Sequence, residues 1–140
     1  MNVAEFLQLQ ALERPDAIAI AEPIKGRSAN RELPLEQRYR CLTFHELDED
    51  SSRLAAGLLA MGIEPGTRLA LMIPPGCEFV SWVFAMFKAG VVSVLIDPGM
   101  GHKNMIDCLQ RVETEGFIGV SLVQAAVSYT HLTLPTIYSV

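Results

Sequence analysis

The chain has 140 residues, a formal net charge of −5 and 50% hydrophobic residues. This length and composition suit one globular domain, or a piece of one, with a single sizeable hydrophobic core. The acidic balance argues against nucleic acid or an anionic membrane surface as the main partner. Its three cysteines, Cys41, Cys77 and Cys108, form no CxxC pair and indicate a reducing cytoplasm and no metal site. The first residues lack a basic region followed by an apolar one, so no signal peptide is expected.

The N-terminal third predicts a helix followed by a β-hairpin. Asn2 and Glu5 have the spacing of a capping box, and residues 3–13 predict a helix that buries one stripe. The stripe expected to be buried comprises Val3, Phe6, Leu7 and Ala11. Residues 17–21 and 38–44 predict two strands that pair antiparallel.

The polar connection 22–37 carries Lys25, Arg27 and Arg31 among acidic residues. A basic anion-binding loop and a solvated hairpin tip are both open, and the mixed signs favour the solvated tip.

A second helix is expected after the hairpin. Thr43 and Glu46 form another capping box, and Gly62 suits the stop. Its buried face is expected to carry Leu47, Leu54, Leu58 and Met61. His45, in the first turn, has no partner for catalysis and is expected on the surface. Residues 64–67 (Glu-Pro-Gly-Thr) predict a type II turn into the next strand.

Residues 68–98 read as strand, buried helix and strand. Apolar runs at 68–73 and 91–96 flank a helix at 78–89 that ends at Gly90, which predicts a βαβ unit in a sheet covered on both faces. Cys77, near the helix start, is expected to be a small buried side chain rather than a nucleophile. The run 79–96 is long enough to suggest a membrane span, but Lys88 would then lie at mid-membrane, so no span is expected.

The segment after this unit predicts a Gly-rich turn, a helix and a short strand. Residues 99–104 (Gly-Met-Gly-His-Lys-Asn) match neither GxGxxG nor the P-loop pattern. Backbone amides there could bind phosphate, and the alternative is a tight strand-to-helix turn. The helix buries Met105, Ile106, Leu109 and Val112, and residues 117–120 form the strand.

Three stretches then carry a family resemblance. Leu42-Thr-Phe-His-Glu-Leu47 resembles the first core motif of the adenylate-forming (AMP-binding, acyl-CoA synthetase-like) superfamily, and residues 87–98 resemble its second. Residues 66–79 are similar to the strand and helix start between them. The sequence Asp-Pro-Gly-Met-Gly at 97–101 is similar to the corresponding sequence in the branch that contains fatty-acid CoA ligases and olefin β-lactone synthetases. The resemblance covers about residues 3–120.

The resemblance implies a fold and a chemistry. The fold would be a β-hairpin plus a βαβαβ layer, a truncated portion of an adenylate-forming enzyme's large N-terminal domain. The parent would use ATP and Mg²⁺ to convert a small carboxylic acid, fatty or β-hydroxy, into acyl-AMP, and then form a CoA thioester or a β-lactone, with loading of a carrier protein as the alternative.

No catalytic, cofactor-binding or metal residue is carried over from the family. The phosphate loop, a Ser/Thr-Gly-rich stretch ending in Pro-Lys-Gly, does not occur in this sequence, and Lys88 and Lys103 match no catalytic position. The chain's partner would be the remainder of its own enzyme, and by itself it is expected to turn over no ATP, to expose apolar faces around Trp82, and to aggregate.

The C-terminal stretch differs from what precedes it. Residues 127–136 (Val-Ser-Tyr-Thr-His-Leu-Thr-Leu-Pro-Thr) can be back-translated to GTC TCT TAT ACA CAT CTG ACG CTG CCG ACG, which looks like a transposase adapter of sequencing libraries. We therefore expect residues 1–126 to be the N-terminal part of an adenylation domain and residues 127–140 to be a non-native tail. A natural strand is the alternative.

A different class of protein also stays open. A small flavodoxin-like α/β module could bind a ligand without catalysis. Such modules usually carry acidic residues at a strand end or a phosphate loop after the first strand. The Pro-Pro-Gly at 74–76 and the isolated Asp97 disfavour it.

Overall fold

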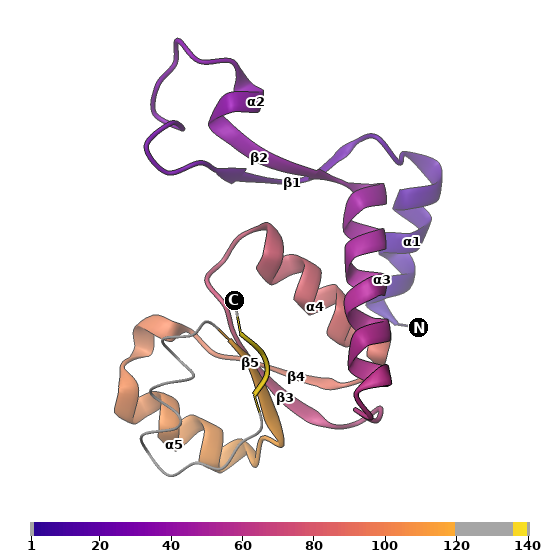
Figure 1. Ribbon diagram of the computed structural model, residues 1–140, viewed down its shortest axis with the longest axis vertical. Helices are drawn as coiled ribbons and strands as arrows, with labels where there is room; N and C mark the ends of the chain where they lie inside the picture. The colour runs from indigo at the N-terminus through magenta and orange to yellow at the C-terminus, as the bar shows by residue number, and fades with distance from the viewer. Residues whose placement is uncertain (1, 120–135, 140) are drawn as a thin grey trace.

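A computed structural model describes residues 2–119 and 136–139. An antiparallel hairpin, β1 (Ile18–Pro23) with β2 (Tyr39–Thr43), projects away from a four-stranded parallel sheet that carries helices on both faces (Figure 1). This confirms the predicted hairpin followed by a βαβαβ layer. Within these ranges no helix is long and apolar enough to cross a membrane.

The first helix, α1 (Val3–Glu13), begins at the predicted capping box. Asn2 Oδ1 accepts from the Ala4 amide at 3.0 Å, and Glu5 Oε1 accepts from the Asn2 amide at 3.2 Å. The predicted stripe was wrong in part, because Val3 and Phe6 are exposed. Ala4, Leu7 and Ala11 are buried instead, since these three positions share the face that contacts α3 and α4.

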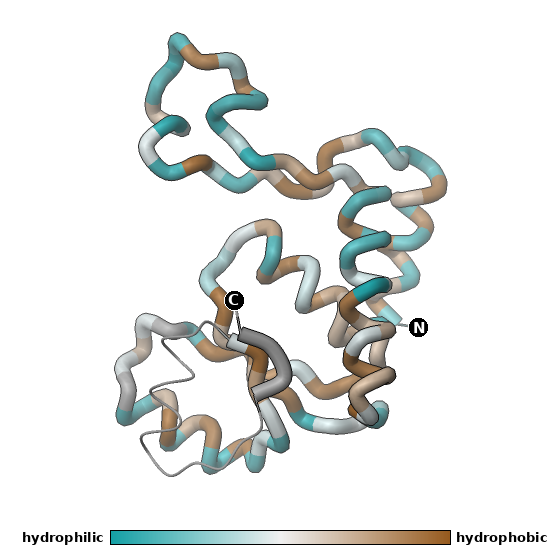
Figure 2. The backbone as a smooth tube through the Cα atoms, viewed as in Figure 1, coloured by the Kyte–Doolittle hydropathy of each residue, from teal (hydrophilic) through white to brown (hydrophobic). Residues whose placement is uncertain are grey.

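The hairpin connection is largely solvated. It contains one helical turn, α2 (Leu35–Arg38), and the guanidinium of Arg38 donates to the Ser28 carbonyl oxygen at 2.7 and 3.0 Å. Lys25, Arg27 and Arg31 are exposed. Figure 2 shows this tip as mostly hydrophilic, with apolar residues between. This is the solvated tip that the sequence favours.

Helix α3 (Phe44–Ala60) opens at the second predicted capping box, with Thr43 Oγ1 and the Glu46 carboxylate each accepting an amide. Its buried face consists of Leu47, Ser51, Ala55 and Leu58, with Leu54 half-buried. The prediction for Met61 was wrong: it is 60% exposed, because it is the C-cap residue beyond the last helical turn.

The sheet begins with β3 (Arg68–Met72), which follows the turn at 64–67 that the sequence predicts. Helix α4 (Cys77–Ala89) crosses over to β4 (Val92–Leu95), parallel to β3. A 3₁₀ turn η1 (Pro98–Met100), helix α5 (His102–Val112) and β5 (Gly116–Gly119) follow, and β6 (Thr136–Ser139) completes the strand order β4-β3-β5-β6.

Because right-handed crossovers in opposite directions put their helices on opposite faces, α4 and α5 cover different sides of the sheet. The two buried clusters show this. One joins α3 and α4 to Leu69, Leu71 and Ile118, and the other joins α5 to Ala70, Met72 and Phe117.

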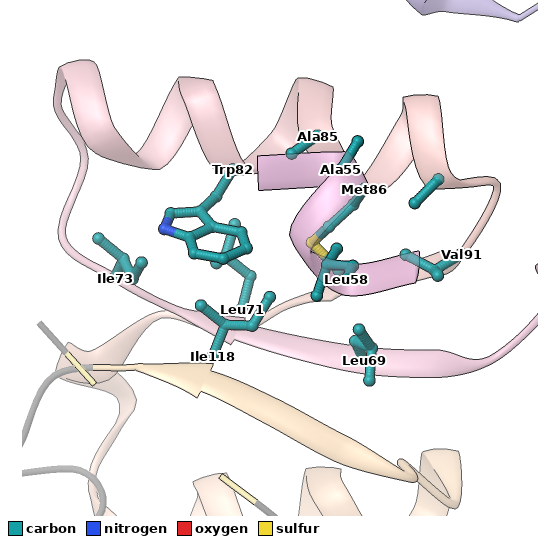
Figure 3. Close-up of a cluster of buried hydrophobic side chains, with 11 residues drawn as sticks. Ala55, Leu58, Leu69, Leu71, Ile73, Trp82, Ala85, Met86, Val91 and Ile118 are labelled. Atoms are coloured by element: carbon teal, nitrogen blue, oxygen red, sulfur yellow. The ribbon is translucent and has the colours of Figure 1, made fainter. Parts of the chain in front are cut away.

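The larger cluster is centred on Trp82 (Figure 3). Its indole lies over the sheet beside Ile73 and Leu71, with Met86 and Leu58 alongside. Trp82 is only 4% exposed and residues 77–89 are all buried or half-buried, so the expectation of exposed apolar faces around Trp82 was wrong for this helix. Helix α3 and β5 already cover this face, contacts that the periodicity of one helix does not reveal.

Strand β4 departs from the prediction of a strand buried on both faces. Its end residues Val92 and Leu95 are 49% and 54% exposed. The apolar run was interpreted correctly as a strand, but a run of this kind does not reveal that the strand lies at the edge of the sheet formed by residues 68–119 and 136–139. The predicted extension of the last strand to Val120 lies outside the described residues, as do residues 127–135 of the expected tail.

Candidate functional site

The helix that carries the first motif stretch, α3, is joined to the second motif stretch by one lysine. Lys88, in the last turn of α4, donates to the Asp48 carboxylate at 2.6 Å, to the Asp48 carbonyl at 2.8 Å and to Ser52 Oγ at 2.8 Å. Its side chain is 9% exposed and that of Asp48 is 27% exposed. An ammonium has three donors, and all three are used. Lys88 therefore joins α4 to α3 and has no donor left for a phosphate.

The third motif stretch is attached to the same junction. The Gly66 amide donates to the Gly90 carbonyl at 2.9 Å, and the Gly90 backbone is left-handed, with φ 70°. A Cβ at Gly90 would lie 3.3 Å from Pro65 Cβ. The left-handed backbone favours glycine there, and a Cβ would also bring Pro65 into a tight contact.

The N-terminus of α4 is capped from the hairpin. Glu22 Oε2 accepts from the Cys77 amide at 2.9 Å, and a Cβ on Gly76 would lie 2.8 Å from the Glu22 carboxylate. A carboxylate at a helix N-terminus satisfies an unpaired amide and complements the dipole. The hairpin is thus anchored to the sheet layer by a contact between residues 55 positions apart.

Cys77 is buried, as expected, and its thiol donates to the Arg40 carbonyl at 3.7 Å. Burial, and then the hydrogen bond and negative charge of Glu22, raise the pKa of this thiol above 9.0. The thiol therefore stays protonated at neutral pH, which is unsuitable for a nucleophile.

A cleft of about 390 Å³ separates the hairpin from the α3–α4 pair. Its charged lining residues are Arg40, Arg53, Asp50 and Glu78, and Arg53 is already ion-paired to Asp50. Opposite charges in one lining do not make an anion site, so the cleft has no convergent set of groups for a phosphate.

The Gly-rich turn after β4 is held by Asp97, whose carboxylate accepts from the Gly99 amide at 2.8 Å. Phosphate binding there stays a prediction. His45 is exposed on α3, and its Nε2 lies 3.9 Å from Glu49 Oε2. Lys103 is exposed on α5.

The side chains of this region do not form a site for a nucleotide and its metal. Over residues 2–119 and 136–139, no three His, Cys, Asp or Glu side chains come together as metal ligands. The buried lysine is fully bonded, and the acidic Asp97 side chain is used in its own turn. We therefore derive no catalytic step from these residues.

The fold is shared with larger proteins of known structure. The chain superposes on VinN with a TM-score of 0.79 and 22% identity, over 99% of this chain and 33% of that one. It superposes on fatty acid AMP ligase from Legionella pneumophila with a TM-score of 0.74 and 19% identity, over 98% and 23%. The shared fold is an α/β layer with a projecting β-hairpin.

The sequence gives the family. The pattern of the family described as AMP-binding enzyme matches residues 7–136, and the chain belongs to this family. It is 42% identical over 125 residues to olefin beta-lactone synthetase of Xanthomonas campestris, covering 89% of this chain and 22% of that protein. It is 31% identical over 121 residues to medium-chain fatty-acid–CoA ligase of Escherichia coli, covering 86% and 20%.

These findings confirm the resemblance and its branch, and they decide against the flavodoxin-like binding module. The chain spans about a fifth of the length of these relatives. Sequence reasoning missed two contacts, Lys88 with Asp48 and Glu22 with Cys77. Both join residues at least 40 positions apart, and no local pattern marks either.

Proposed function

We propose that this chain is the N-terminal part of an ATP-dependent, AMP-forming acid ligase. A carboxylate oxygen of the substrate attacks the α-phosphorus of ATP, with Mg²⁺ present, and pyrophosphate leaves. A nucleophile then attacks the acyl carbon and AMP leaves. The observation that carries this proposal is 42% identity to a β-lactone synthetase across 89% of the chain.

The substrate class follows from the relatives at the level of the parent enzyme. A fatty or β-hydroxy acid fits both a fatty-acid–CoA ligase and an olefin beta-lactone synthetase. The second nucleophile is then either the CoA thiol or the substrate's own β-hydroxyl. Free cysteines at positions 41, 77 and 108 suit a reducing cytoplasm as the location.

Within the parent, this chain acts as a scaffold. The junction at Lys88 and the cap at Glu22 hold the hairpin, the α3–α4 pair and the sheet in one unit. The nucleotide site would be assembled against this unit by residues beyond the chain, so the chain alone should turn over no ATP.

We also propose that residues 127–140 are a non-native tail. The support is the continuous adapter-like back-translation of residues 127–136. Two observations favour the alternative of a natural strand. The family match runs to residue 136, inside this segment, and β6 pairs in parallel with β5. Reading the source DNA across position 126 without transposase adapters tests the proposal, and an unchanged sequence through residue 140 would contradict it.

The same DNA sequencing leads to the functional test. If the frame continues, the longer protein is expected to exchange labelled pyrophosphate into ATP in the presence of Mg²⁺ and a medium-chain or β-hydroxy acid. The 140-residue chain at equal concentration is the control and should stay at the no-enzyme rate. A longer, folded protein that exchanges no pyrophosphate with any acid tested would overturn the proposed function.

A further inference from the structure

An apolar groove lies at the base of the hairpin, where α1, β1, α3 and α4 meet. It has a volume of about 300 Å³, and each of the four elements contributes apolar side chains to its lining, which include Phe6, Ile20, Leu47 and Phe84. Among the described residues that line it, Gln10 alone has a polar side chain. Small-molecule sites are concave and mostly apolar, with volumes upward of about 300 Å³. The groove therefore has the size and lining of a site for a small ligand with an apolar body.

The groove has a closed floor and an open wall. Leu7 and Leu47 are 3% and 2% exposed, whereas Val3 and Phe6 are each 55% exposed. The groove also runs along α1, because Val3 and Gln10 both line it and are separated by two helical turns, about 10 Å at 1.5 Å per residue. An elongated apolar groove of this kind can accept an unbranched alkyl chain from solvent.

A cation lies at the end of the groove where α1 finishes. Arg14, the C-cap residue of α1, donates through Nε to Gln10 Oε1 at 2.5 Å. Its guanidinium carbon lies 4.8 Å from the centre of the Phe44 ring. Gln10 and Phe44 both line the groove, so these two contacts hold the guanidinium beside its end. Because the guanidinium is already held, a ligand that binds it costs little further side-chain entropy.

The terminal nitrogens of Arg14 are available to a ligand. A guanidinium carries five N–H donors, and the bond to Gln10 uses only the one on Nε. Within residues 2–119 and 136–139, the hydrogen bonds and ion pairs leave both Nη atoms of Arg14 unused. Glu13 and Asp16, its acidic neighbours in sequence, form no ion pair with it in these ranges. Parallel N–H donors of a guanidinium match the two oxygens of a carboxylate.

We propose that this groove is a binding site for an alkyl carboxylate, with the alkyl chain in the groove and the carboxylate on Arg14. The apolar lining and the cation together favour this class of ligand. An uncharged apolar ligand would leave Arg14 without a partner, and a small anion would leave the groove unfilled. The proposal goes beyond the proposed function, because binding here requires neither ATP nor Mg²⁺ and leaves the acid chemically unchanged.

Titration of the 140-residue chain with decanoate, below its micellar concentration, tests the proposal. Calorimetry gives the Kd, and the methyl resonances of Leu7, Ile20 and Leu47 report on the groove itself. Decanoate should bind saturably at one site and shift these resonances. Octanoate and hexanoate should bind progressively more weakly, by about fourfold for each methylene removed, which is the effect of burying one methylene. Decanol and decyltrimethylammonium should bind at least about tenfold more weakly than decanoate, because neither offers a carboxylate to Arg14.

Substitutions separate the two parts of the site. Arg14→Gln should weaken decanoate binding at least about tenfold and leave decanol binding unchanged, because it removes the charge and keeps the groove. Arg27→Gln is the matched control, since Arg27 is exposed at the hairpin tip, and it should change neither. Ala19→Leu adds volume to the lining and should weaken the binding of both ligands. Urea midpoints followed by Trp82 fluorescence identify any variant that does not fold.

The ligand comparisons need no variant, so they decide the proposal even if a variant does not fold. Groove methyls that do not respond to millimolar decanoate, or equal binding of decanoate and decanol, would overturn it. Groove resonances that shift with protein concentration and not with decanoate would overturn it in favour of a second copy as the occupant.

The same titration applies to the longer protein, if the reading frame continues. Its groove methyls should respond to decanoate as they do in the chain, and a loss of that response would identify the remainder of the enzyme as the occupant and overturn the proposal. None of these measurements uses ATP. Pyrophosphate exchange without shifts of the groove methyls would leave the proposed function standing without this inference, and shifts without exchange would leave the reverse.

Discussion

Replacing Lys88 by methionine should destabilise the fold far more than the loss of an ordinary surface charge. Methionine keeps most of the apolar stem, so the change removes chiefly the ammonium and its three hydrogen bonds. Breaking a fully buried ion pair costs about 3–5 kcal/mol. The Asp48 side chain left behind is 27% exposed and regains part of its hydration. We therefore expect a loss of about 2–3 kcal/mol.

The assay is urea denaturation followed by tryptophan fluorescence. Trp82 is the only tryptophan and is buried against the sheet, so its emission reports unfolding of this layer. With a urea m-value of about 2 kcal/mol/M, the midpoint should fall by about 1–1.5 M. Lys103→Met is the matched control, because Lys103 is exposed on α5. A Lys88→Met change smaller than about 0.5 kcal/mol would refute the buried-junction argument, since surface pairs contribute that little.

Three further changes test the other contacts. Gly76→Ala displaces the Glu22 carboxylate, so Gly76→Ala and Glu22→Ala should each lower the free energy of unfolding by about 1–2 kcal/mol in urea titrations. The double variant should lose no more than one of the single variants, and full additivity would show that the two residues do not share one interaction. Gly90→Ala should cost about 1 kcal/mol or more in the same titration, because alanine is strained at φ 70°, and an unchanged midpoint would contradict this. Above pH 9.0 the unfolded chain loses the Cys77 proton while the folded chain keeps it, so the free energy of unfolding should fall as pH rises; Cys77→Ala should flatten that fall and Cys41→Ala should not, as followed by Tm against pH.

The parts of the fold that the sequence predicts are those decided locally. Both capping boxes, at Asn2 and Thr43, need only residues within one helical turn, and both form as expected. The βαβ unit follows from apolar runs and from Gly90, whose left-handed conformation ends α4. The hairpin follows from two strands around a polar connection.

The parts that the sequence does not predict depend on distant neighbours. Val3, Phe6 and Met61 have the spacing of core residues but are exposed, since no element among the described residues covers them fully. Trp82 is covered by α3 and β5, which its own helix pattern cannot show. Apolar periodicity shows which side chains can be buried, and the topology decides which of them are.

The candidate site illustrates the same limit. Resemblance to the family locates the motifs, and the structure shows that Lys88, Asp48 and Gly90 hold them together. In this chain they connect neighbouring elements: the charges of Lys88 and Asp48 are paired, and the hydrogen-bond donors of Lys88 are all used. The missed contacts of Glu22 and Lys88 are long-range hydrogen bonds, and a single sequence carries no signal for such pairs.

The order of the three strands β4-β3-β5 also bears on how the sheet can be built during synthesis. Its first strand in the chain, β3, lies in the interior, and each later strand adds at an outer position beside strands already paired. No hydrogen-bonded pair has to open to admit a newcomer. The sheet can therefore grow outward in the order in which a ribosome delivers it, with β3 and β4 as its first closed unit.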